Sequence, residues 1–179
     1  YKIADVIGIG GGLILALGTV ELEKDIPVQD SSGMFAHAKL TGKARAVGFN
    51  FGVHYDLTKK VTVAVTYRSQ INMRLNEGEA DFTVPTSLDA NFPDQQFTGS
   101  LPLPSVTTLG LAYKPSKKVS CVLDINYVGW KAYDTLAFDY ETNTSSLADT
   151  KSPRDYHNIF AFRGGLAYEF NKFLTVRAG

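Results

Sequence analysis

The chain has 179 residues, 18 basic and 18 acidic side chains that cancel, and a single cysteine. The length suits one domain, the zero net charge gives no general attraction to nucleic acid, and one cysteine excludes an internal disulfide or a multi-cysteine metal site. The most apolar run, residues 6–17, contains four glycines and is shorter than the about 20 residues of a spanning helix.

Alternating apolar and polar residues predict seven strands. In chain order they cover about residues 5–24, 43–56, 60–84, 104–115, 118–142, 157–170 and 172–179. Successive side chains of a strand point to opposite faces, so this alternation indicates one apolar face and one polar face. The predicted class is therefore all-β.

The third predicted strand shows the pattern best. In residues 61–76 the odd positions are mostly apolar, from Val61 to Leu75, while the even positions include Arg68 and Arg74. We predict one continuous apolar face along the odd positions. The strand is longer than the about 5–6 residues usual in soluble proteins and the about 9–11 of a tilted strand that crosses a bilayer. We therefore expect it to continue beyond a membrane.

The fifth predicted strand contains a change of phase. Its apolar residues are odd-numbered up to Tyr127, whereas Trp130 and Phe138 are even-numbered. A β-bulge at Gly129 would explain this change, because a bulge inserts one extra residue into a strand.

The predicted connections alternate in length. Short turns lie at residues 56–59, 115–117 and 171–172, and long polar links at about residues 25–35, 85–103 and 143–156. Aromatic residues stand beside the short turns: Tyr55, Tyr113, Tyr168, Phe170 and Phe173. Both features are typical of outer-membrane barrels. A soluble sandwich or a lipocalin-like barrel also alternates, but the long strands and the charges on the non-aromatic face favour a transmembrane antiparallel β-barrel.

The chain starts without Met at Tyr1 and stops within a predicted strand. Because barrels of this kind have an even number of strands, we expect residues 1–179 to be a fragment of one barrel domain.

Several segments resemble the FadL/TodX family of outer-membrane transporters for long-chain fatty acids and aromatic hydrocarbons. They are LPLPS at 101–105, LGLAYKP at 109–115, DINYVGW at 124–130, SPRDY at 152–156, FAFRGG at 160–165 and LTVRAG at 174–179. The resemblance covers most of the chain, in family order. It implies a monomeric, fourteen-stranded barrel in the outer membrane of a Gram-negative bacterium, without a cofactor. A hydrophobic small molecule would diffuse passively through this barrel.

The resemblance also implies a hatch formed by an N-terminal segment and a sideways exit through the barrel wall. Neither feature can be placed on this chain, because the similar segments correspond to the middle of the barrel. We expect the hatch and the remaining strands to lie outside residues 1–179.

The predicted lumen face carries polar residues that could bind a ligand: Arg68, Asn72, Arg74, Asp124, Arg163 and Arg177. Arginine suits a carboxylate because its guanidinium binds both oxygens. The alternative is that these arginines form ion pairs with Asp124 or Glu169.

Other features have plain explanations. Gly8, Gly10 and Gly12 share one face and could let a ligand approach the backbone, or could simply let the sheet curve. The three histidines are too irregularly spaced to predict a metal site. A calcium site among the acidic residues of the 139–155 region is a weaker prediction than solvated charges.

No nucleophile motif is present, so we do not expect an enzyme. The alternative function is a structural or partner-binding component of a surface or secretion complex. The apolar residues near the long link at 85–103 fit either a capture site for a ligand or a patch for a partner: Phe82, Leu88, Phe92 and Phe97.

Overall fold

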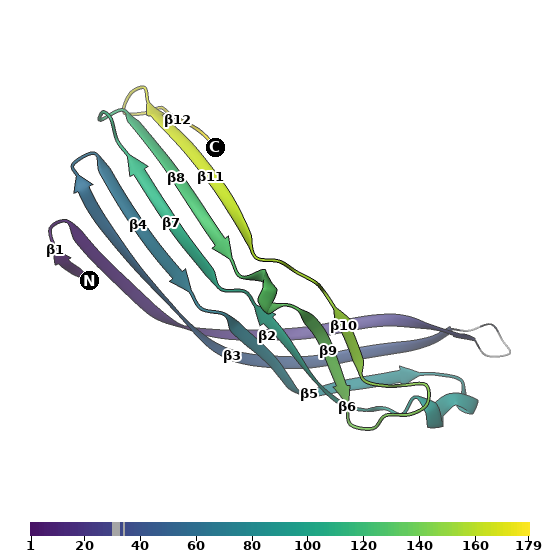
Figure 1. Cartoon of the computed structure of the whole chain (residues 1–179). Helices are drawn as coiled ribbons and strands as arrows, with labels where there is room; N and C mark the ends of the chain where they lie inside the picture. The colour runs from purple at the N-terminus through teal and green to yellow at the C-terminus, as the bar shows by residue number, and fades with distance from the viewer. Residues whose placement is uncertain (30–32, 34) are drawn as a thin grey trace.

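A computed structural model describes residues 1–29, 33 and 35–179 (Figure 1). In this part of the chain the strands pair antiparallel in a single twelve-stranded sheet. The strands are β1 (Lys2–Ala4), β2 (Ile7–Gln29), β3 (Phe35–Thr58), β4 (Val61–Arg68), β5 (Ile71–Thr83), β6 (Gln95–Leu103), β7 (Val106–Tyr113), β8 (Val119–Val128), β9 (Thr135–Tyr140), β10 (Thr150–Pro153), β11 (Ile159–Glu169) and β12 (Thr175–Ala178). Two 3-10 helices, η1 (Thr86–Asn91) and η2 (Trp130–Ala132), accompany them. No helix in the described residues is long and apolar enough to cross a membrane.

The strands make seven passes along the sheet, as predicted. β2, β3 and β12 are single passes, while β4 with β5, β6 with β7, β8 with β9 and β10 with β11 are interrupted ones. Short turns join the passes at one end, and longer connections join them at the other (Figure 1). The first hairpin is longer than expected: β2 reaches Gln29 and β3 begins at Phe35, while residues 30–32 and 34 of the predicted link lie outside the described residues.

Hydrogen bonds across the sheet join the interruptions to the neighbouring passes. The Ser69 amide donates to the Phe49 carbonyl at 2.9 Å, and the Gly129 amide donates to the Ser105 carbonyl at 2.9 Å. Further along, the Lys131 amide donates to Asn158 Oδ1 at 3.0 Å. The predicted irregularity at Gly129 is thus a break that contains η2, one of a line of breaks across the sheet.

This line divides the sheet into two parts. The proximal part consists of residues 7–17 of β2, 46–58 of β3, β4, β7, β8, β11 and β12. The distal part consists of residues 18–29, 35–45, β5, β6, β9 and β10. Figure 1 shows the distal part bending away from the direction of the proximal strands.

A bulge at residues 69–70 reverses the faces of the third pass. Asn50 lies opposite Arg68 in the proximal part, whereas Arg45 lies opposite Arg74 in the distal part. Five residues of β3 therefore match six residues of the third pass, and the extra residue turns the following side chains to the other face as far as Leu75. A second shift between Leu75 and Gly78 then restores the original faces. The prediction of one continuous apolar face over residues 61–76 is wrong for this reason.

Gly48 makes room for the bulge. A Cβ atom at Gly48 would lie 2.5 Å from Ile71 Cγ1 and 3.0 Å from Ser69 Oγ. The same Ser69 hydroxyl accepts a 3.0 Å hydrogen bond from the Phe49 amide. The bare backbone of Gly48 thus lets the side chain of Ile71 turn inward and pack against the sheet.

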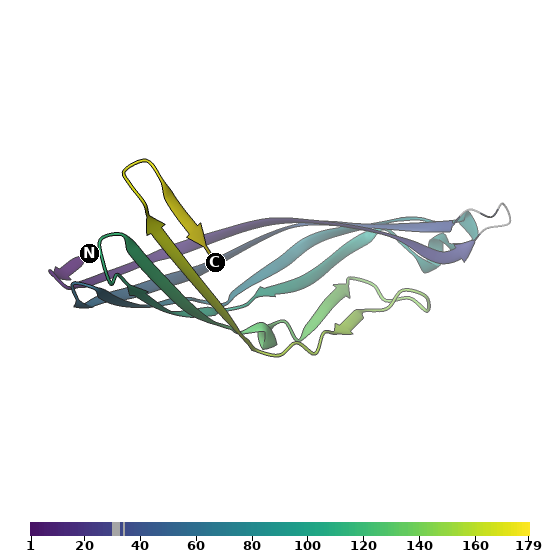
Figure 2. The same ribbon diagram turned by 90° about the horizontal axis from the view of Figure 1, so that it is seen from above.

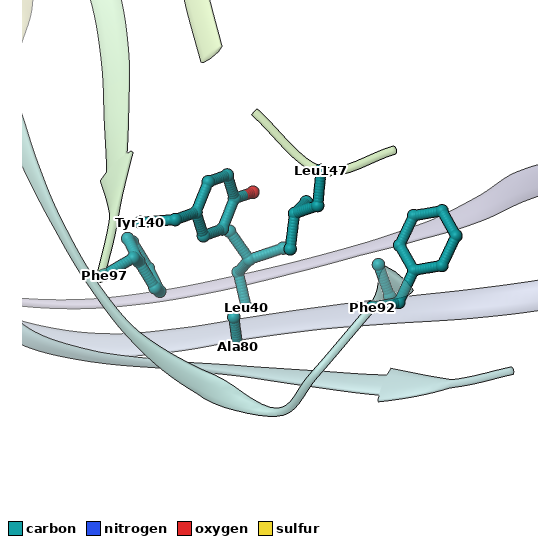
Figure 3. Close-up of a cluster of buried hydrophobic side chains, with 7 residues drawn as sticks. Leu40, Ala80, Phe92, Phe97, Tyr140 and Leu147 are labelled. Atoms are coloured by element: carbon teal, nitrogen blue, oxygen red, sulfur yellow. The ribbon is translucent and has the colours of Figure 1, made fainter. Parts of the chain in front are cut away.

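The distal part encloses a core on one face, here called the inner face. Figure 2 shows that the sheet curls until β9 and β10 lie across from the β2–β3 hairpin. Seven buried residues fill the space between them (Figure 3): Ala38, Leu40, Ala80, Phe92, Phe97, Tyr140 and Leu147. Phe97 is 1% exposed and packs over the bare backbone of Gly78. A second cluster forms nearby around Ala44, Ile71, Met73 and Leu75.

The inner face continues from the distal part into the proximal part. β2 and β3 pair without a shift from Ile26 opposite Ala36 to Ile7 opposite Tyr55. Even-numbered residues of β3 face inward in the distal core, so the even-numbered residues of its proximal half face inward too. The odd-numbered residues form the outer face.

Candidate lumen face

The side chains on the inner face of the proximal part are mostly small or polar. Register places Gly10, Gly52, Thr66, Thr108 and Asn126 side by side across five strands. A cavity of about 930 Å³ lies along β2, β3, β4 and the start of β7. The lining includes inward-facing residues of these strands: Gly8, Gly10, Asn50, Gly52, His54, Ala64, Thr66, Arg68 and Thr108.

The glycines of β2 serve two purposes in this cavity. A Cβ atom at Gly8 would collide with the imidazole of His54, so Gly8 gives that ring its place across the strand pair. Nothing lies within 4 Å of a Cβ atom at Gly10, which leaves the backbone there open to the cavity. Close approach of another molecule to the backbone is therefore sterically possible at Gly10 but not at Gly8.

Asn126 is a lumen residue that the sequence did not single out. The Thr108 hydroxyl donates to Asn126 Oδ1 at 2.7 Å, and the residue is only 7% exposed. Its amide nitrogen, Nδ2, has no hydrogen-bond partner among the described residues. A buried donor without a partner costs free energy, so this site would favour an acceptor from outside the described chain. Alternation alone placed Asn126 on the polar face, but its burial depends on neighbouring strands.

Four of the predicted site residues face inward. Arg68 lies in the row of Asn50, Arg163 lies opposite Asp124, and Arg177 lies opposite Ala167 of β11. Within the described residues, these arginines form no ion pair with Asp124 or Glu169. The Asp124 carboxylate instead leans over Gly110, with Oδ1 3.1 Å from a Cβ position there. Whether these residues bind a ligand stays a prediction.

The other two predicted site residues, Asn72 and Arg74, do not face the lumen. They follow the bulge at residues 69–70, so they lie on the outer face, while Met73 between them and Leu75 after them are buried. The assumption of an unbroken alternation through residues 61–76 was wrong at this point. Asn72 Oδ1 accepts a 2.7 Å hydrogen bond from Gln70 on the same surface.

The described residues contain no group of three or more side chains that could hold a metal ion. His37 Nδ1 lies 2.9 Å from Asp25 on the outer face of the distal part, far along β3 from His54. Asp149, from the acidic region considered for calcium, accepts a 3.0 Å hydrogen bond from the Tyr140 amide, which orders the loop over the distal core.

The outer face of the proximal part has the opposite character. Large apolar side chains are exposed along every strand, among them Leu13 at 87%, Phe162 at 70% and Val47 at 69%. In water, so much exposed apolar surface would be unfavourable. β8 and β11 contain 10 and 11 residues, which matches the about 9–11 residues of a tilted strand that crosses a bilayer.

Aromatic residues border this apolar surface at both ends. Tyr55, Tyr113 and Tyr168 lie on the outer face near the short turns, as predicted, and Tyr168 packs edge-on against Phe170 at 4.6 Å. Near the line of breaks, Phe51 packs against Tyr67 at 5.8 Å and Tyr127 against Phe160 at 5.1 Å. Two aromatic belts around an apolar band are typical of membrane barrels.

The family comparison agrees with this geometry. The profile of a family described as outer membrane protein transport protein (OMPP1/FadL/TodX) matches residues 1–179. The chain belongs to the OMPP1/FadL/TodX family. The chain is therefore a multi-pass β-barrel protein of the outer membrane of a Gram-negative bacterium. Because short turns face the periplasm in such barrels, the distal part of this FadL-type chain faces the cell exterior.

Solved structures of FadL-type proteins share the fold. A FadL homologue from Pseudomonas aeruginosa is 17% identical with a TM-score of 0.79, and 99% of this chain covers 46% of that chain. The Ralstonia pickettii toluene transporter TbuX is 16% identical with a TM-score of 0.71, and the match covers 99% of this chain and 51% of TbuX. The Pseudomonas putida toluene transporter TodX is 18% identical with a TM-score of 0.67, again covering 99% and 51%.

The chain thus spans about half the length of these structures. The comparison with curated proteins found no match. At these identities the structures establish the fold alone, and the matching family is described as outer membrane transport proteins.

Proposed function

We propose that this chain forms part of the wall of a channel through which hydrophobic small molecules diffuse passively across the outer membrane. The observation that carries the proposal is the contrast between the two faces of the proximal part. Apolar and aromatic side chains face the lipid, while glycines and polar residues line a cavity of about 930 Å³ on the inner face. A sheet with lipid on one side and an open lumen on the other is the wall of a channel rather than a packed domain.

Part of the proposal is that further strands close this sheet into a barrel, with a hatch within it. In the described residues the sheet is open, with β1 and β2 at one edge and β12 at the other edge of the proximal part. An open edge within hydrocarbon would leave backbone amides and carbonyls without partners, which is very unfavourable. Closure by more strands would satisfy these groups.

We propose long-chain fatty acids as a substrate class because Arg68 lines the cavity. Its guanidinium has no ion-pair partner among the described residues and suits a carboxylate. A neutral hydrocarbon such as toluene, which the solved relatives TbuX and TodX transport by name, would not need this charge. The choice between an acid and a hydrocarbon therefore depends on Arg68.

Among the described residues, the apolar side chains near the 85–103 link form no exposed patch that would favour a partner-binding function. The residues that fitted such a patch are packed inside: Phe92 and Phe97 are buried in the distal core, and Phe82 and Leu88 pack against it. Phe82 lies 5.9 Å from Phe92, ring to ring. We also propose that the protein is not an enzyme, because the family model that it matches describes transport proteins.

The test is uptake into proteoliposomes that carry the purified protein, with labelled oleate and labelled toluene in parallel. We expect protein-dependent entry of oleate that stops at equal concentrations and needs no energy source. Arg68→Gln should lower the rate for oleate several-fold and leave toluene unchanged, and Thr62→Gln, near the turn on the same strand, is the matched control. Folded protein that passes neither compound would contradict the proposal, and equal slowing of both compounds would remove the carboxylate role of Arg68.

A further inference from the structure

Three basic side chains lie together on the outer face of the distal part. Arg45 of β3 and Arg74 of β5 occupy directly opposite positions in the strand pair. Lys43 lies two residues from Arg45 on the same strand and hence on the same face. All three residues are exposed. We call Lys43, Arg45 and Arg74 the basic cluster.

The basic cluster has no partner within the chain. Like charges directly opposite each other on a sheet are destabilising, yet no described residue forms an ion pair or hydrogen bond with these three side chains. Glu77, in the bulge before Gly78, is near in sequence but does not pair with them. The arrangement therefore leaves three positive charges available to something outside the described residues.

Lys39 on the same face shows the opposite situation. Its Nζ lies 2.6 Å from Glu21 Oε1 and 3.0 Å from Glu23 Oε1. Hydrogen bonds to these two carboxylates raise the pKa of Lys39, and Lys39 in turn lowers the pKa of Glu23. Glu21 and Glu23 of β2 are thus already engaged by Lys39, which lies farther from the apolar band than the basic cluster does.

The basic cluster borders the membrane. Arg45 lies opposite Leu17, the last apolar outer-face residue of β2, and two residues from Val47; both are more than two-thirds exposed. Beyond the cluster the outer face becomes acidic and mixed, with Glu21 and Glu23 on β2 and Glu79 on β5. The three charges therefore lie at the height where the headgroups of the outer leaflet meet the barrel.

We propose that the basic cluster binds the phosphate groups of lipid A in the outer leaflet of the outer membrane. Lipid A combines acyl chains, which fit the apolar band at Leu17 and Val47, with phosphates at the level of Arg45 and Arg74. Guanidinium groups bind phosphate through paired hydrogen bonds. Basic side chains close to an anionic membrane surface each contribute about fivefold in affinity. This inference does not depend on which molecule passes through the lumen.

The test is binding of fluorescent bis-phosphorylated lipid A to the purified protein in neutral detergent micelles. The triple variant Lys43→Gln, Arg45→Gln, Arg74→Gln should bind about 100-fold more weakly, since three charges are removed at about fivefold each. Lys39→Gln is the matched control, because it removes one exposed outer-face charge that is already paired; it should change binding little. The double variant Arg45→Lys, Arg74→Lys should retain most of the affinity.

Two further measurements make the result decisive. The substituted positions are exposed, so every variant should keep the heat-resistant mobility of a folded barrel on gels. Lipid A stripped of its phosphates should bind the wild type as weakly as intact lipid A binds the triple variant, and millimolar inorganic phosphate should compete only weakly. Equal binding of intact lipid A by wild type and triple variant would overturn the proposal. A loss of the same size in Lys39→Gln would also overturn it, because the effect would then reflect general charge.

Discussion

The proximal and distal parts of this sheet share the same strands but have opposite polarity. In the proximal part of β2 and β3 the large apolar residues are odd-numbered and face lipid, whereas the even-numbered residues that line the cavity are glycine or polar. In the distal part the even-numbered residues, such as Ala38 and Leu40, form the core, and odd-numbered residues such as Lys39 are charged. β2 and β3 need no bulge for this reversal, because the apolar residues themselves move from odd-numbered to even-numbered positions along each strand.

The apolar face of a strand therefore indicates which side of the strand meets lipid or a packed core, and not which side is the inside of the protein. Lipid surrounds the proximal part, so its apolar residues point outward. Water surrounds the distal part, so its apolar residues point inward and pack as in a soluble protein. In the third pass a bulge makes this change instead. The odd-numbered apolar residues between Val61 and Leu75 lie on the outer face before residues 69–70 and on the inner face after them.

The largest expected difference between the two parts concerns a buried and a lipid-facing phenylalanine. Phe97→Ala removes a side chain that is 1% exposed, and such changes typically destabilise by about 3–5 kcal/mol. Phe162→Ala, at a position that is 70% exposed, leaves no cavity because lipid fills the space, so its cost should be much smaller. Hydrogen exchange of the distal strands, measured in lipid vesicles, should show local opening for Phe97→Ala alone. Equal protection in both variants would mean that the distal core is not closed.

A charge placed on alternate faces of β4 tests the proximal part. Val65→Arg puts a charge into the lipid, which costs about 2–4 kcal/mol near the centre of a bilayer. Thr66→Arg puts the same charge into the lumen cavity, so the cost should be small. Urea unfolding in lipid vesicles, followed by the fluorescence of Trp130, measures both. Similar losses at the two positions would contradict the assignment of faces.

The bulge itself should be sensitive to one methyl group. Gly48→Ala places a Cβ atom 2.5 Å from Ile71 Cγ1, and overpacking of this kind costs about 1–3 kcal/mol. Gly10→Ala is the control, because nothing lies within 4 Å of the added atom. Ile71→Val should partly rescue Gly48→Ala in the same unfolding measurement. If Gly48→Ala were as stable as Gly10→Ala, the close packing of Ile71 against β3 would be incorrect.

The smallest effect concerns the ion pairs of the distal outer face. Lys39 lowers the pKa of Glu23, so this pairing stabilises the hairpin above the ordinary pKa of a glutamate and is lost as the pH falls through the lowered value. Both groups are exposed, so the loss should be small and should shrink further in high salt. NMR titration of the Glu23 carboxyl in wild type and in Lys39→Gln measures the shift directly. An identical titration in both proteins would show that the pair does not form.

The sequence predicted the number of passes, the short turns and the aromatic residues near them, because each depends on local alternation or turn chemistry. Two long links were predicted too long, because β6 (Gln95–Leu103) lies within the predicted link at 85–103 and β10 (Thr150–Pro153) within that at 143–156. It also indicated an irregularity at Gly129, where the phase changes visibly. It did not reveal the bulge at residues 69–70, because apolar residues continue on odd positions from Val65 to Met73 without any change of phase. Only the pairing partner on β3 shows that the faces exchange there.

The prediction of the candidate site residues failed at some positions for the same reason. Arg68 precedes the bulge and was placed on the correct face, whereas Arg74 follows it and was not. The buried amide of Asn126 was missed because its burial and its bond from Thr108 come from a neighbouring strand. Contacts of this kind depend on register between strands, which alternation within one strand does not determine.

The measurement that tests the reversal of faces most directly is a cysteine scan of the third pass in a Cys121→Ala background. Single cysteines at Val63, Val65, Ile71, Met73 and Arg74 would be labelled with a fluorophore in lipid vesicles and quenched from within the acyl chains. We predict strong quenching at Val63 and Val65, none at Ile71 and Met73, and access of an aqueous reagent at Arg74. Equal quenching by lipid at Val65, Ile71 and Met73 would contradict it, because the odd positions would then form one continuous lipid-facing surface.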